Sequence, residues 1–481
     1  MNRIHARVEV LTEEEIERIH RATLEVLSTV GCRLPHRKVL DRLEREGAEV
    51  DRASARVRMG AELVERALGA LSGGRRTSGD ERFQGGVLRD GRLRLGLSTQ
   101  ANIVDYETSS RRRGTTDDVL RGIAVTNELP HVGYAMPVVV PSDVPAYMAD
   151  LYGYYLCALY SRKPFGVYIM SPESGRQIVR LARARYRGED VRIWYLLEPN
   201  GALSYDDFSL ELAISFAESG QGFCLGPMAM AGLDAPVTLA GTLVMQNAHN
   251  LIGNVLAYLW GQPGGWSGSA HTADMRTGTC LFGSPNQMLI GVAAVQIGGW
   301  YGFGSGANCA LTDACTPDFQ AGFEKGASAL MMLLAGGGFG AQGIVGADQG
   351  VSLEQLVIDD EWAGYLEHAL SHGIEVNDET LGLEAIRRAG IGGSFIDDEH
   401  TARHMRTTQW HSTIFNWDVF EAWKAKGALD TRSRARARLE EILARCYPPE
   451  LLVSAEAKAE MDAIVEEARA HPERFEVRRY A

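Results

Sequence analysis

The chain has 481 residues, of which 45% are apolar and 23% charged, as in ordinary globular proteins. Its length suggests two or three structural regions, or one large α/β barrel with additions. The formal net charge of −13 argues against binding to nucleic acid, whose phosphates require a basic surface. No apolar run of about 18 residues predicts a membrane span, and the first residues lack the apolar core of a signal peptide. The seven cysteines form no CxxC pair, which fits reduced thiols in a cytoplasmic protein.

The first part of the chain is predicted to be a helical cap with a small β element. Thr12 and Glu15 have the spacing of a capping box at the start of an amphipathic helix, and two shorter helical patterns follow it. Asp90-Gly91 then separates two short alternating segments, the pattern of a β-hairpin with a type I′ turn.

Apolar strand patterns alternate with helical patterns from about residue 115 onward, for roughly eight units. Such alternation indicates parallel βαβ units, and the number of units favours a closed (β/α)8 barrel, the TIM barrel, over an open sheet. We therefore expect residues 1–110 to form an N-terminal helical region with a hairpin and residues 111–420 to form a TIM-barrel catalytic domain. Residues 421–481 are charged at helical spacing and are predicted to be a C-terminal helical extension.

Small residues concentrate between Gly220 and Gly350, most of all in residues 299–322. A TIM barrel carries its chemistry on the loops that follow its strands, and loops poor in bulky side chains leave room for a pocket. Residues 299–322 are predicted to be a strand end with its loop, whose aromatic and acidic side chains face this pocket. The alternative is that the small residues merely let helices pack closely against strands.

Several residues near the predicted strand ends are candidates for this pocket. Aromatic rings would enclose a quaternary ammonium ion by cation–π attraction, with ordinary core packing as the alternative for several of them. Glu198 and Asp313 are the candidate catalytic carboxylates, and Asp318 is a candidate substrate-binding one. Arg276 and His271 could hold a substrate carboxylate, the guanidinium in a bidentate arrangement. The aromatic candidates are Trp194, Tyr195, Trp266, Trp300, Tyr301 and Phe303.

Two further patterns are weaker. The glycine spacing at residues 338–343 matches a dinucleotide-binding loop, but no helix start follows it, so a Rossmann site is not expected. His400 and His404 are four residues apart and could ligate a metal together with a third residue. They lie beyond the predicted barrel strands, however, and surface or packing roles are favoured. Cys309 and Cys315 lack the paired spacing of a metal site and are interpreted as small core thiols, so no metal is predicted.

Segments spread from residue 11 to about 406 carry a resemblance to known enzymes. They include LTEEEIERIHRATLEVLSTVGCRL, VDYETSSRRRGTTDDVLRGI, VVVPSDVPAYMADLYGYY, APVTLAGTLVMQNAHNLIG, GSPNQMLIGVAAVQI, LTDACTPDFQAGFEKGAS and GGSFIDDEHTARHMR. Through them the chain resembles the trimethylamine methyltransferase family of corrinoid-dependent amine methyltransferases. It is more similar to members without pyrrolysine, such as glycine betaine methyltransferases, because every position is a standard amino acid.

The resemblance implies a TIM barrel and the transfer of a methyl group from an amine to the Co(I) of a partner corrinoid protein. The absence of pyrrolysine favours a quaternary amine of the glycine betaine type over trimethylamine. Its nitrogen already carries the activating charge and leaves as a neutral amine, so binding, desolvation and orientation are what the protein must supply. No tightly bound cofactor of its own is expected. Gly304, Gly338 and Gly340 are candidates for glycines over which the corrin ring docks, and a homo-oligomer is expected.

Two other classes of function stay open. A cofactor-independent TIM-barrel lyase or isomerase would use Glu198, Asp313 or Asp318 as its base and would act without cobalt. A non-catalytic betaine-binding protein would bind its ligand and transfer nothing.

Overall fold

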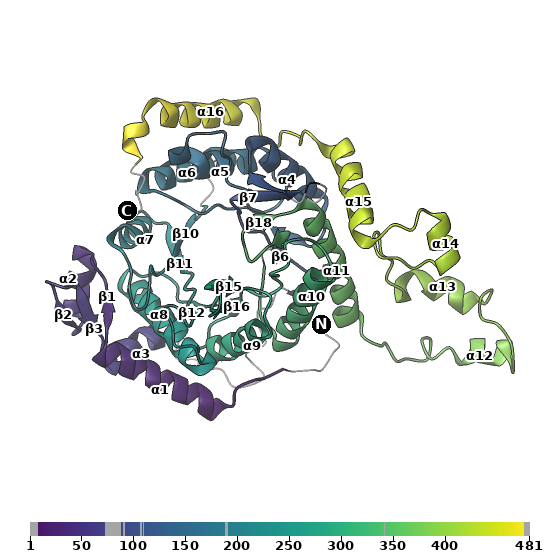
Figure 1. Ribbon diagram of the computed structural model, residues 1–481, viewed down its shortest axis with the longest axis horizontal. Coiled ribbons are helices and arrows are strands. Elements are labelled where there is room, and N and C mark those ends of the chain that lie inside the picture. The colour runs from purple at the N-terminus through teal and green to yellow at the C-terminus, as the bar shows by residue number, and fades with distance from the viewer. Residues whose placement is uncertain are drawn as a thin grey trace.

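The computed structural model describes residues 8–72, 88–89, 92–105, 108, 110–187, 191–340 and 342–475. It is a mixed structure in which long helices surround short, mostly parallel strands (Figure 1). In the part of the chain so described, no helix is both long and apolar enough to cross a bilayer.

A ring of alternating strand segments and helices occupies the centre of the molecule (Figure 1). Each segment is followed by a helix on the outside of the ring, the order predicted from the alternating sequence pattern. The strand segments are β6 (Leu95–Gly96), β9 (Val132–Tyr134), residues 165–169, β10 (Trp194–Leu197), β11 (Gly222–Leu225), β13 (Trp266–Gly268), β16 (Ser305–Ala307) and residues 338–340. The helices that follow them in turn are α4 (Thr116–Glu128), α5 (Ala149–Tyr160), α6 (Pro172–Arg185), α7 (Asp207–Glu218), α8 (Leu239–Leu259), α9 (Pro285–Trp300), α10 (Phe319–Ala335) and α11 (Leu353–His372).

Neighbouring segments of the ring pair in parallel over short stretches. β6 pairs with β9, β10 with β11, and β13 with β16. Beyond the ends of β11 and β13, β12 (Met230–Ala231) pairs with β14 (His271–Asp274). Single parallel bridges join Ala135 to Phe165, Gly306 to Gly338, and Gly340 to Gly96. No backbone pairing among the described residues joins residues 165–169 to β10. The predicted parallel βαβ order is therefore confirmed, whereas a closed sheet is not found.

Glycines let the ring elements approach one another closely. A Cβ on Gly306 would lie 2.8 Å from the carbonyl oxygen of Gly338, and one on Gly268 would lie 2.2 Å from Cβ of Ala294 on α9. Neither contact is sterically possible, so packing alone requires glycine at these positions. Close packing of strands and helices therefore explains part of the glycine content of residues 220–350, which is the alternative given in the sequence analysis.

The N-terminal elements cover one side of the ring. α1 (Glu13–Thr29) and α3 (Ala61–Ser72) pack against α8. The predicted capping box is confirmed: Glu15 N donates to the Thr12 hydroxyl, and the Glu15 carboxylate accepts from Thr12 N at 2.7 Å. The smaller elements are β1 (Cys32–Arg33), α2 (Arg37–Arg45), β2 (Glu49–Asp51), β3 (Arg56–Arg58), β4 (Leu88–Arg89) and β5 (Arg92–Leu93). Antiparallel pairing of β4 with β5 confirms the predicted hairpin, whose turn residues 90–91 lie outside the described residues.

Loops after several ring strands carry short hairpins. β14 pairs antiparallel with β15, and β7 and β18 join in a sheet of order β17-β18-β7-β8. These strands are β7 (Asn102–Asp105), β8 (Ser110–Arg113), β15 (Thr279–Leu281), β17 (Ile344–Val345) and β18 (Gly350–Val351).

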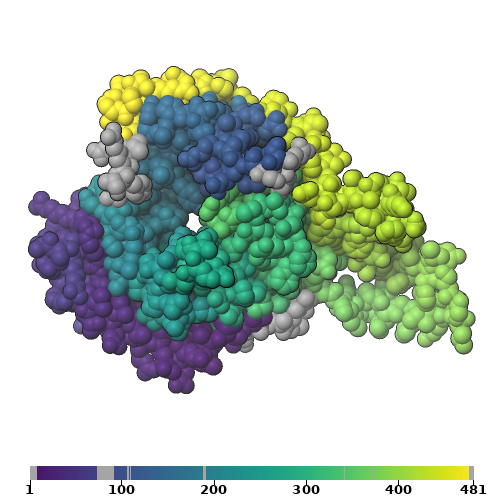
Figure 2. Space-filling view, in the orientation of Figure 1, coloured from purple at the N-terminus to yellow at the C-terminus, as the bar shows by residue number. Residues whose placement is uncertain are grey.

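The C-terminal part of the chain returns to the ring after a projecting arm. α15 (Thr431–Cys446) packs on α4 and α11, and α16 (Ala455–Ala470) packs on α5 and α6. Between α11 and α15, residues 373–430 leave the ring and project to one side (Figures 1 and 2). We call these residues the arm; it contains α12 (Leu383–Ala389), α13 (Glu399–Thr408) and α14 (Phe420–Ala425). The ring itself extends from β6 to the end of α11.

Candidate functional site

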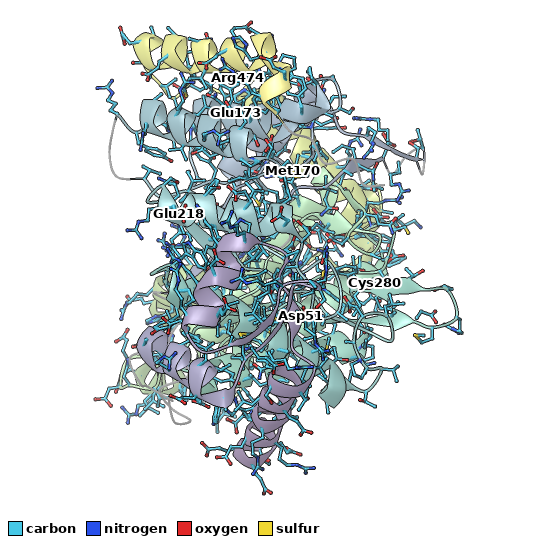
Figure 3. All side chains as sticks on the ribbon, turned by 90° about the vertical axis from the view of Figure 1, so that its left-hand side faces the viewer. Asp51, Met170, Glu173, Glu218, Cys280 and Arg474 are labelled. Carbon is cyan, nitrogen blue, oxygen red and sulfur yellow. The ribbon has the colours of Figure 1, made fainter. Side chains whose placement is uncertain are left out.

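The carboxyl ends of the ring strands meet at one end of the ring, which we call the mouth. The β14–β15 hairpin, on which Figure 3 labels Cys280, projects from this end. Figure 2 shows a hollow at the centre of the mouth, between the blue, teal and green parts of the chain. Side chains that point from the strand ends into the ring line this hollow, which we call the chamber.

Glu198 follows β10 directly and faces the chamber. Exposure alternates along this strand: Trp194 and Glu198 are exposed, whereas Tyr195 and Leu197 are buried. Because successive side chains of a strand point to opposite faces, Glu198 shares the inner face with Trp194. Although the side chain is open to the chamber, desolvation by the surrounding chamber wall raises the pKa of Glu198. It makes no hydrogen bond or ion pair with any other described residue. An unpaired carboxylate therefore stands in the chamber wall.

Cys224 lies on β11, the strand that pairs with β10. Its thiol is open to the chamber, yet burial raises the pKa of Cys224 to about 11, and the charge of Glu198 acts in the same direction. A Cβ on Gly226 would lie 2.7 Å from the Leu196 side chain, so glycine at this position leaves room for that side chain. The thiol is therefore protonated at neutral pH and accessible from the chamber.

Two tyrosines from neighbouring segments add aromatic surface. Tyr134 is 45% exposed and Tyr168 is 39% exposed. A Cβ on Gly166 would lie 2.0 Å from the Tyr134 hydroxyl, so glycine at this position makes room for the ring. Burial raises the pKa of Tyr168, and the charges of Asp348 and Glu198 raise it further. Both carboxylates thus lie close enough to the Tyr168 ring to act on it.

Asp348 is the second carboxylate of the chamber and comes from the loop after the last ring segment. Gly346, Ala347 and Asp348 have φ values of 66°, 55° and 59°, a left-handed conformation that is unfavourable for the two non-glycine residues. Gln100 Nε2 donates to Asp348 Oδ1 at 2.7 Å and so fixes the direction of the carboxyl group. Burial raises the pKa of Asp348, although this hydrogen bond opposes the rise. Strained backbone that presents a polar group is typical of functional sites.

His271 and Asn308 form a neutral pair at the start of β14. The imidazole is fully buried, and burial lowers the pKa of His271 to about 4. Asn308 Nδ2 lies 3.2 Å from His271 Nε2 and 4.0 Å from Met228 Sδ. A neutral imidazole can orient a polar group, but it does not supply the positive charge predicted to hold a substrate carboxylate.

Arg276, the other predicted partner of a substrate carboxylate, stands at the tip of the β14–β15 hairpin. Its side chain is 88% exposed and forms a bidentate pair with Asp274 at 2.9 and 3.0 Å. This hydrogen bonding lowers the pKa of Asp274 to about 2. Arg276 is therefore occupied at the surface and is not brought to the chamber wall.

The remaining predicted carboxylates bind backbone groups. Asp313 accepts from Phe282 N at 2.8 Å and from Gly283 N at 3.0 Å. Burial raises the pKa of Asp313, and these two bonds oppose the rise. Asp318 is the N-cap of α10 and accepts from Ala321 N at 3.1 Å. Asp313 therefore joins the loop between β16 and α10 to the segment after β15, and Asp318 caps the start of α10.

Trp300, Tyr301 and Phe303 precede β16 and lie at the end of the ring opposite the mouth. The Tyr301 hydroxyl is 2.8 Å from His20 Nδ1 and accepts from Asn247 Nδ2 at 2.8 Å. The Trp300 ring packs on His20 with a centroid distance of 5.2 Å. Trp300 and Tyr301 therefore join α1 to the ring, away from the chamber. The strand predicted at this stretch begins after them.

Two further aromatic candidates point outward from the ring. Tyr195 packs on Phe216 of α7 with a centroid distance of 6.2 Å, and Trp266 Nε1 donates to Asn247 Oδ1 at 3.0 Å. Both rings are buried against helices. Of the predicted site residues, the structure therefore brings Glu198 and Trp194 to the inner face of the ring.

The glycines proposed to face a corrin ring have other neighbours. Gly338 and Gly340 form the bridges that join the last segment to its two neighbours. Gly304 directly precedes β16, at the end away from the mouth. Residues 338–343 lead into β17 and not into a helix, so the context of a dinucleotide-binding loop is missing, as predicted.

His400 and His404 lie on α13 in the arm. Their rings are in contact in a tilted arrangement, with centroids 4.5 Å apart, and His404 Nε2 is 3.2 Å from a Glu379 carboxylate oxygen. Over the ranges that the structure describes, no group of three or more His, Cys, Asp and Glu side chains is arranged to hold a metal.

Tyr134, Tyr168, Cys224 and Asp348 were missed by the sequence analysis. The first three share a signal that could have found them: each is a polar or reactive residue inside a short apolar strand, on the face that alternation turns inward. Asp348 has no such signal, because its place depends on a left-handed loop that the sequence ADQG does not specify.

Comparison with known proteins finds relatives that match nearly the whole length of the chain. The profile of the Trimethylamine methyltransferase (MTTB) family matches residues 1–471. Glycine betaine methyltransferase of Desulfitobacterium hafniense (strain Y51) is 28% identical over 471 residues, which cover 95% of this chain and 97% of that protein. A trimethylamine methyltransferase of Methanosarcina mazei is 30% identical over 484 residues, 95% of each chain. The crystal structure of Methanosarcina barkeri monomethylamine methyltransferase superposes with a TM-score of 0.44 at 12% identity, covering 90% and 88% of the two chains, too weak a similarity to bear on the fold. By the profile match over nearly its whole length, the chain belongs to the trimethylamine methyltransferase family of enzymes.

Proposed function

We propose that this enzyme transfers a methyl group from a quaternary amine to the Co(I) of a corrinoid protein, with the chamber as its substrate site. Family membership supports methyl transfer, and the glycine betaine methyltransferase among its relatives supports a quaternary substrate. We further propose that the ring is a (β/α)8 barrel, because each segment is followed by an outer helix and parallel pairing continues around most of the ring. Substrates of such barrels bind at the carboxyl ends of the strands.

The unpaired carboxylate of Glu198 carries this proposal. Glu198 is exposed to the chamber and makes no ion pair with a described residue, so its charge is available to a cation that enters the chamber. A quaternary ammonium cannot donate a hydrogen bond, so it is recognised by negative charge and by aromatic faces. Glu198 and Asp348 supply the charge, and Tyr134 and Tyr168 supply rings that would each contribute about 0.5–2 kcal/mol.

The chamber residues would act by binding, orienting and excluding water. The cobalt of a docked corrinoid protein would supply the nucleophile, and the open mouth (Figure 2) leaves one side of the chamber accessible to it. The carboxylates offset the loss of hydration of the cation, and the rings restrict its orientation. The raised pKa keeps the Cys224 thiol protonated, so it does not compete for the methyl group as a thiolate would.

The neutral His271 and the surface pair of Arg276 bear on the choice of substrate. Neither places a positive charge in the chamber, so recognition rests on the cationic end of the substrate and not on an anionic end. Choline and tetramethylammonium therefore belong beside glycine betaine, carnitine and trimethylamine in the panel to be tested.

The raised pKa of Glu198 also suits a general base, which favours a cofactor-independent lyase or isomerase as the second candidate.

One experiment separates methyl transfer from the lyase or isomerase reaction. The purified protein is incubated with each amine, with and without free cob(I)alamin, and methylcobalamin is followed by its absorbance while the amine is followed by NMR. Methylcobalamin formed with a quaternary amine supports methyl transfer. Consumption of the amine without cobalt would replace it by the lyase or isomerase. Calorimetric binding of an amine without turnover, either with or without cob(I)alamin, would indicate a binding protein. This outcome must also hold when a corrinoid protein that serves a methyltransferase of this family is added.

A further inference from the structure

Many side chains on the inner face of the ring are small. Along the ring strands, residues that are buried against the outer helices alternate with residues that face the ring axis. In an ordinary (β/α)8 barrel the inward positions hold branched residues such as Val, Ile and Leu, which fill the interior. Here many of them are glycine or serine, so that little side-chain volume closes the centre of the ring. These residues are Gly96, Ser98, Gly166, Gly222, Gly226, Ser267, Gly306, Gly338 and Gly340.

Open space continues from the chamber to the end of the ring opposite the mouth. A Cβ on Gly96 of β6 would meet no other part of the chain within 4 Å, and the same holds for Gly265 and Gly304, which directly precede β13 and β16. Trp194, the first residue of β10, is 40% exposed although its ring lies over Gly222. In Figure 2, which looks along the ring, the background is visible through part of the hollow. We call the end of this space at Trp194, Gly265 and Gly304 the rear opening.

Two arginines lie at the rear opening. Arg94 is two residues before Gly96 and Arg192 is two residues before Trp194, so strand alternation places both on the inner face, at the end away from the mouth. Both are exposed, and neither forms an ion pair or a hydrogen bond with another described residue. The space through the ring therefore has carboxylates at its mouth and unpaired positive charge at its rear.

We propose that the chamber is one end of a channel through the ring, and that the amine enters and its demethylated product leaves by the rear opening. The inference rests on the proposed function, in which a docked corrinoid protein covers the mouth. A passage at the other end of the ring lets substrate and product exchange while the corrinoid protein stays docked.

The two arginines act on passage through the channel and not on the bound substrate. Arg192 precedes Glu198 by six residues, about 20 Å of extended strand, which is longer than glycine betaine. A bare cation such as choline is repelled at the rear opening, whereas the carboxylate of a zwitterion offsets this repulsion. The channel therefore favours quaternary amines with a carboxylate by their rate of entry, although the chamber itself recognises their cationic end.

A cross-link through the ring tests the channel without any reaction. Gly304→Cys places a thiol in the rear opening, and bis-maleimidohexane attached to it is expected to reach Cys224 in the chamber, as detected by peptide mass spectrometry. Gly69→Cys, at an exposed glycine of α3 whose Cβ also meets no other part of the chain, is the matched control and should give no link to Cys224. Gly96→Phe, which fills the open space between the two thiols, should suppress the product.

The cross-link has a clear contrary outcome. Mixed light and 15N-labelled copies identify links between molecules, and circular dichroism confirms that each variant is folded. Absence of a product between positions 304 and 224 within one molecule, in a protein whose Cys224 reacts with a small maleimide from solution, would overturn the channel.

The charge at the rear opening is measured on the same Gly304→Cys protein. Its thiol is modified by a methanethiosulfonate that carries a sulfonate and by one that carries a trimethylammonium group, and the two rates are compared. Arg94→Gln/Arg192→Gln should lower the ratio of the sulfonate rate to the ammonium rate roughly 10-fold. Arg18→Gln/Arg45→Gln removes two exposed arginines elsewhere and should leave the ratio unchanged. An unchanged ratio in the first double variant would remove the arginines from the opening.

Turnover connects the channel to the reaction. With a saturating corrinoid protein that serves a methyltransferase of this family, Gly304→Phe should lower turnover of glycine betaine severalfold. With free cob(I)alamin, which leaves the mouth uncovered between encounters, the same variant should match the wild type. Equal turnover of variant and wild type with the corrinoid protein would refute the rear passage. A wild type that forms no methylcobalamin would refute the proposed function instead, and the cross-link would still decide whether the channel exists.

Discussion

Lys325 on α10 and Asp359 on α11 form an ion pair whose side chains are both fully buried, with Nζ and Oδ2 2.8 Å apart. The Asp359 carboxylate also accepts from Gly343 N at 2.7 Å and from Trp362 Nε1 at 2.8 Å. The pair therefore fixes the backbone at Gly343, where the loop that carries Asp348 begins. A buried pair satisfied in this way is strongly coupled to its surroundings.

Replacing Lys325 by methionine should destabilise the fold, because it leaves the Asp359 carboxylate buried without its cation. The expected loss is about 3–5 kcal/mol, measured as a lower urea midpoint and melting temperature. Lys325→Met/Asp359→Leu should recover part of it, since no buried charge remains. Arg276→Met, which breaks the surface pair with Asp274, should leave both readings unchanged. If Lys325→Met and Arg276→Met lowered the urea midpoint by equal amounts, the buried pair would contribute no more to stability than the surface pair.

Glu198→Gln should weaken the binding of quaternary ammonium ions, since it removes the unpaired charge and keeps the shape of the side chain. Charge attraction at the distance of a bound cation predicts roughly a 10–100-fold rise in Kd, measured by calorimetry with tetramethylammonium and glycine betaine. Glu62→Gln, at a 95% exposed side chain on α3, is the control for the same substitution at the surface. Wild-type affinity in Glu198→Gln would remove Glu198 from the site.

The affinity for these cations should depend on pH through the same carboxylate. Burial raises the pKa of Glu198 above that of an ordinary glutamate, and the protonated form does not attract a cation. Affinity should therefore be full at high pH and should fall, as the pH is lowered through this raised pKa, at a higher pH than an ordinary glutamate would give. Calorimetry across a pH series should show a smaller decline in Glu198→Gln, where Asp348 is the chamber carboxylate that remains. Identical profiles for the two proteins would contradict this assignment.

The order of helices and strands could be read from the sequence because it depends on local periodicity. Thr12, the hairpin around residues 90–91 and the repeated βα units were all found in this way. The strand at residues 305–307 was misplaced relative to Trp300 and Tyr301, because a glycine-rich stretch has no periodicity that shows where a helix ends and a strand begins.

The candidate site was harder to predict because it depends on which way each side chain points. Tyr195 and Glu198 are three residues apart on one strand end, and alternation sends one outward and the other inward. From the sequence alone, Arg276 and His271 look equally suited to bind an anion. Only the structure shows that the arginine is exposed and already paired and that the histidine is buried and neutral. Asp348 depends on a loop conformation held by Gln100, almost 250 residues away in the chain.

Cys224 offers a direct probe of the chamber because its thiol is exposed there. Burial raises its pKa to about 11, so modification by maleimide at neutral pH should be slow compared with that of Cys315, which is also exposed. A saturating quaternary ammonium ion should slow it further, roughly 10-fold or more, and leave Cys315 unaffected. Peptide mass spectrometry follows both residues in one sample, so that Cys315 is an internal control. Equal protection of the two thiols would place the ligand elsewhere.

His131, between β9 and α11, should make the stability of the protein depend on pH. Its Nδ1 lies 3.2 Å from Asp360 Oδ2 and its Nε2 lies 3.7 Å from Glu367 Oε2. Burial by itself would lower the pKa of His131, but the neighbouring carboxylates of Asp360 and Glu367 outweigh it, and the pKa is raised. The protonated ring therefore stabilises the folded state below the unfolded pKa of about 6.5. This contribution is lost as the pH rises through the higher folded value.

His131→Gln should accordingly cost most stability at acidic pH and progressively less as the pH increases. Urea midpoints of wild type and variant, measured from about pH 5.5 to 9, should converge toward the alkaline end. His471→Gln removes a histidine that pairs with Glu473 at the surface, where solvent weakens the interaction, so its midpoint difference should be small throughout. A gap between wild type and His131→Gln that widens with pH would mean that His131 is held neutral in the folded protein, and that its two carboxylate neighbours do not set its charge.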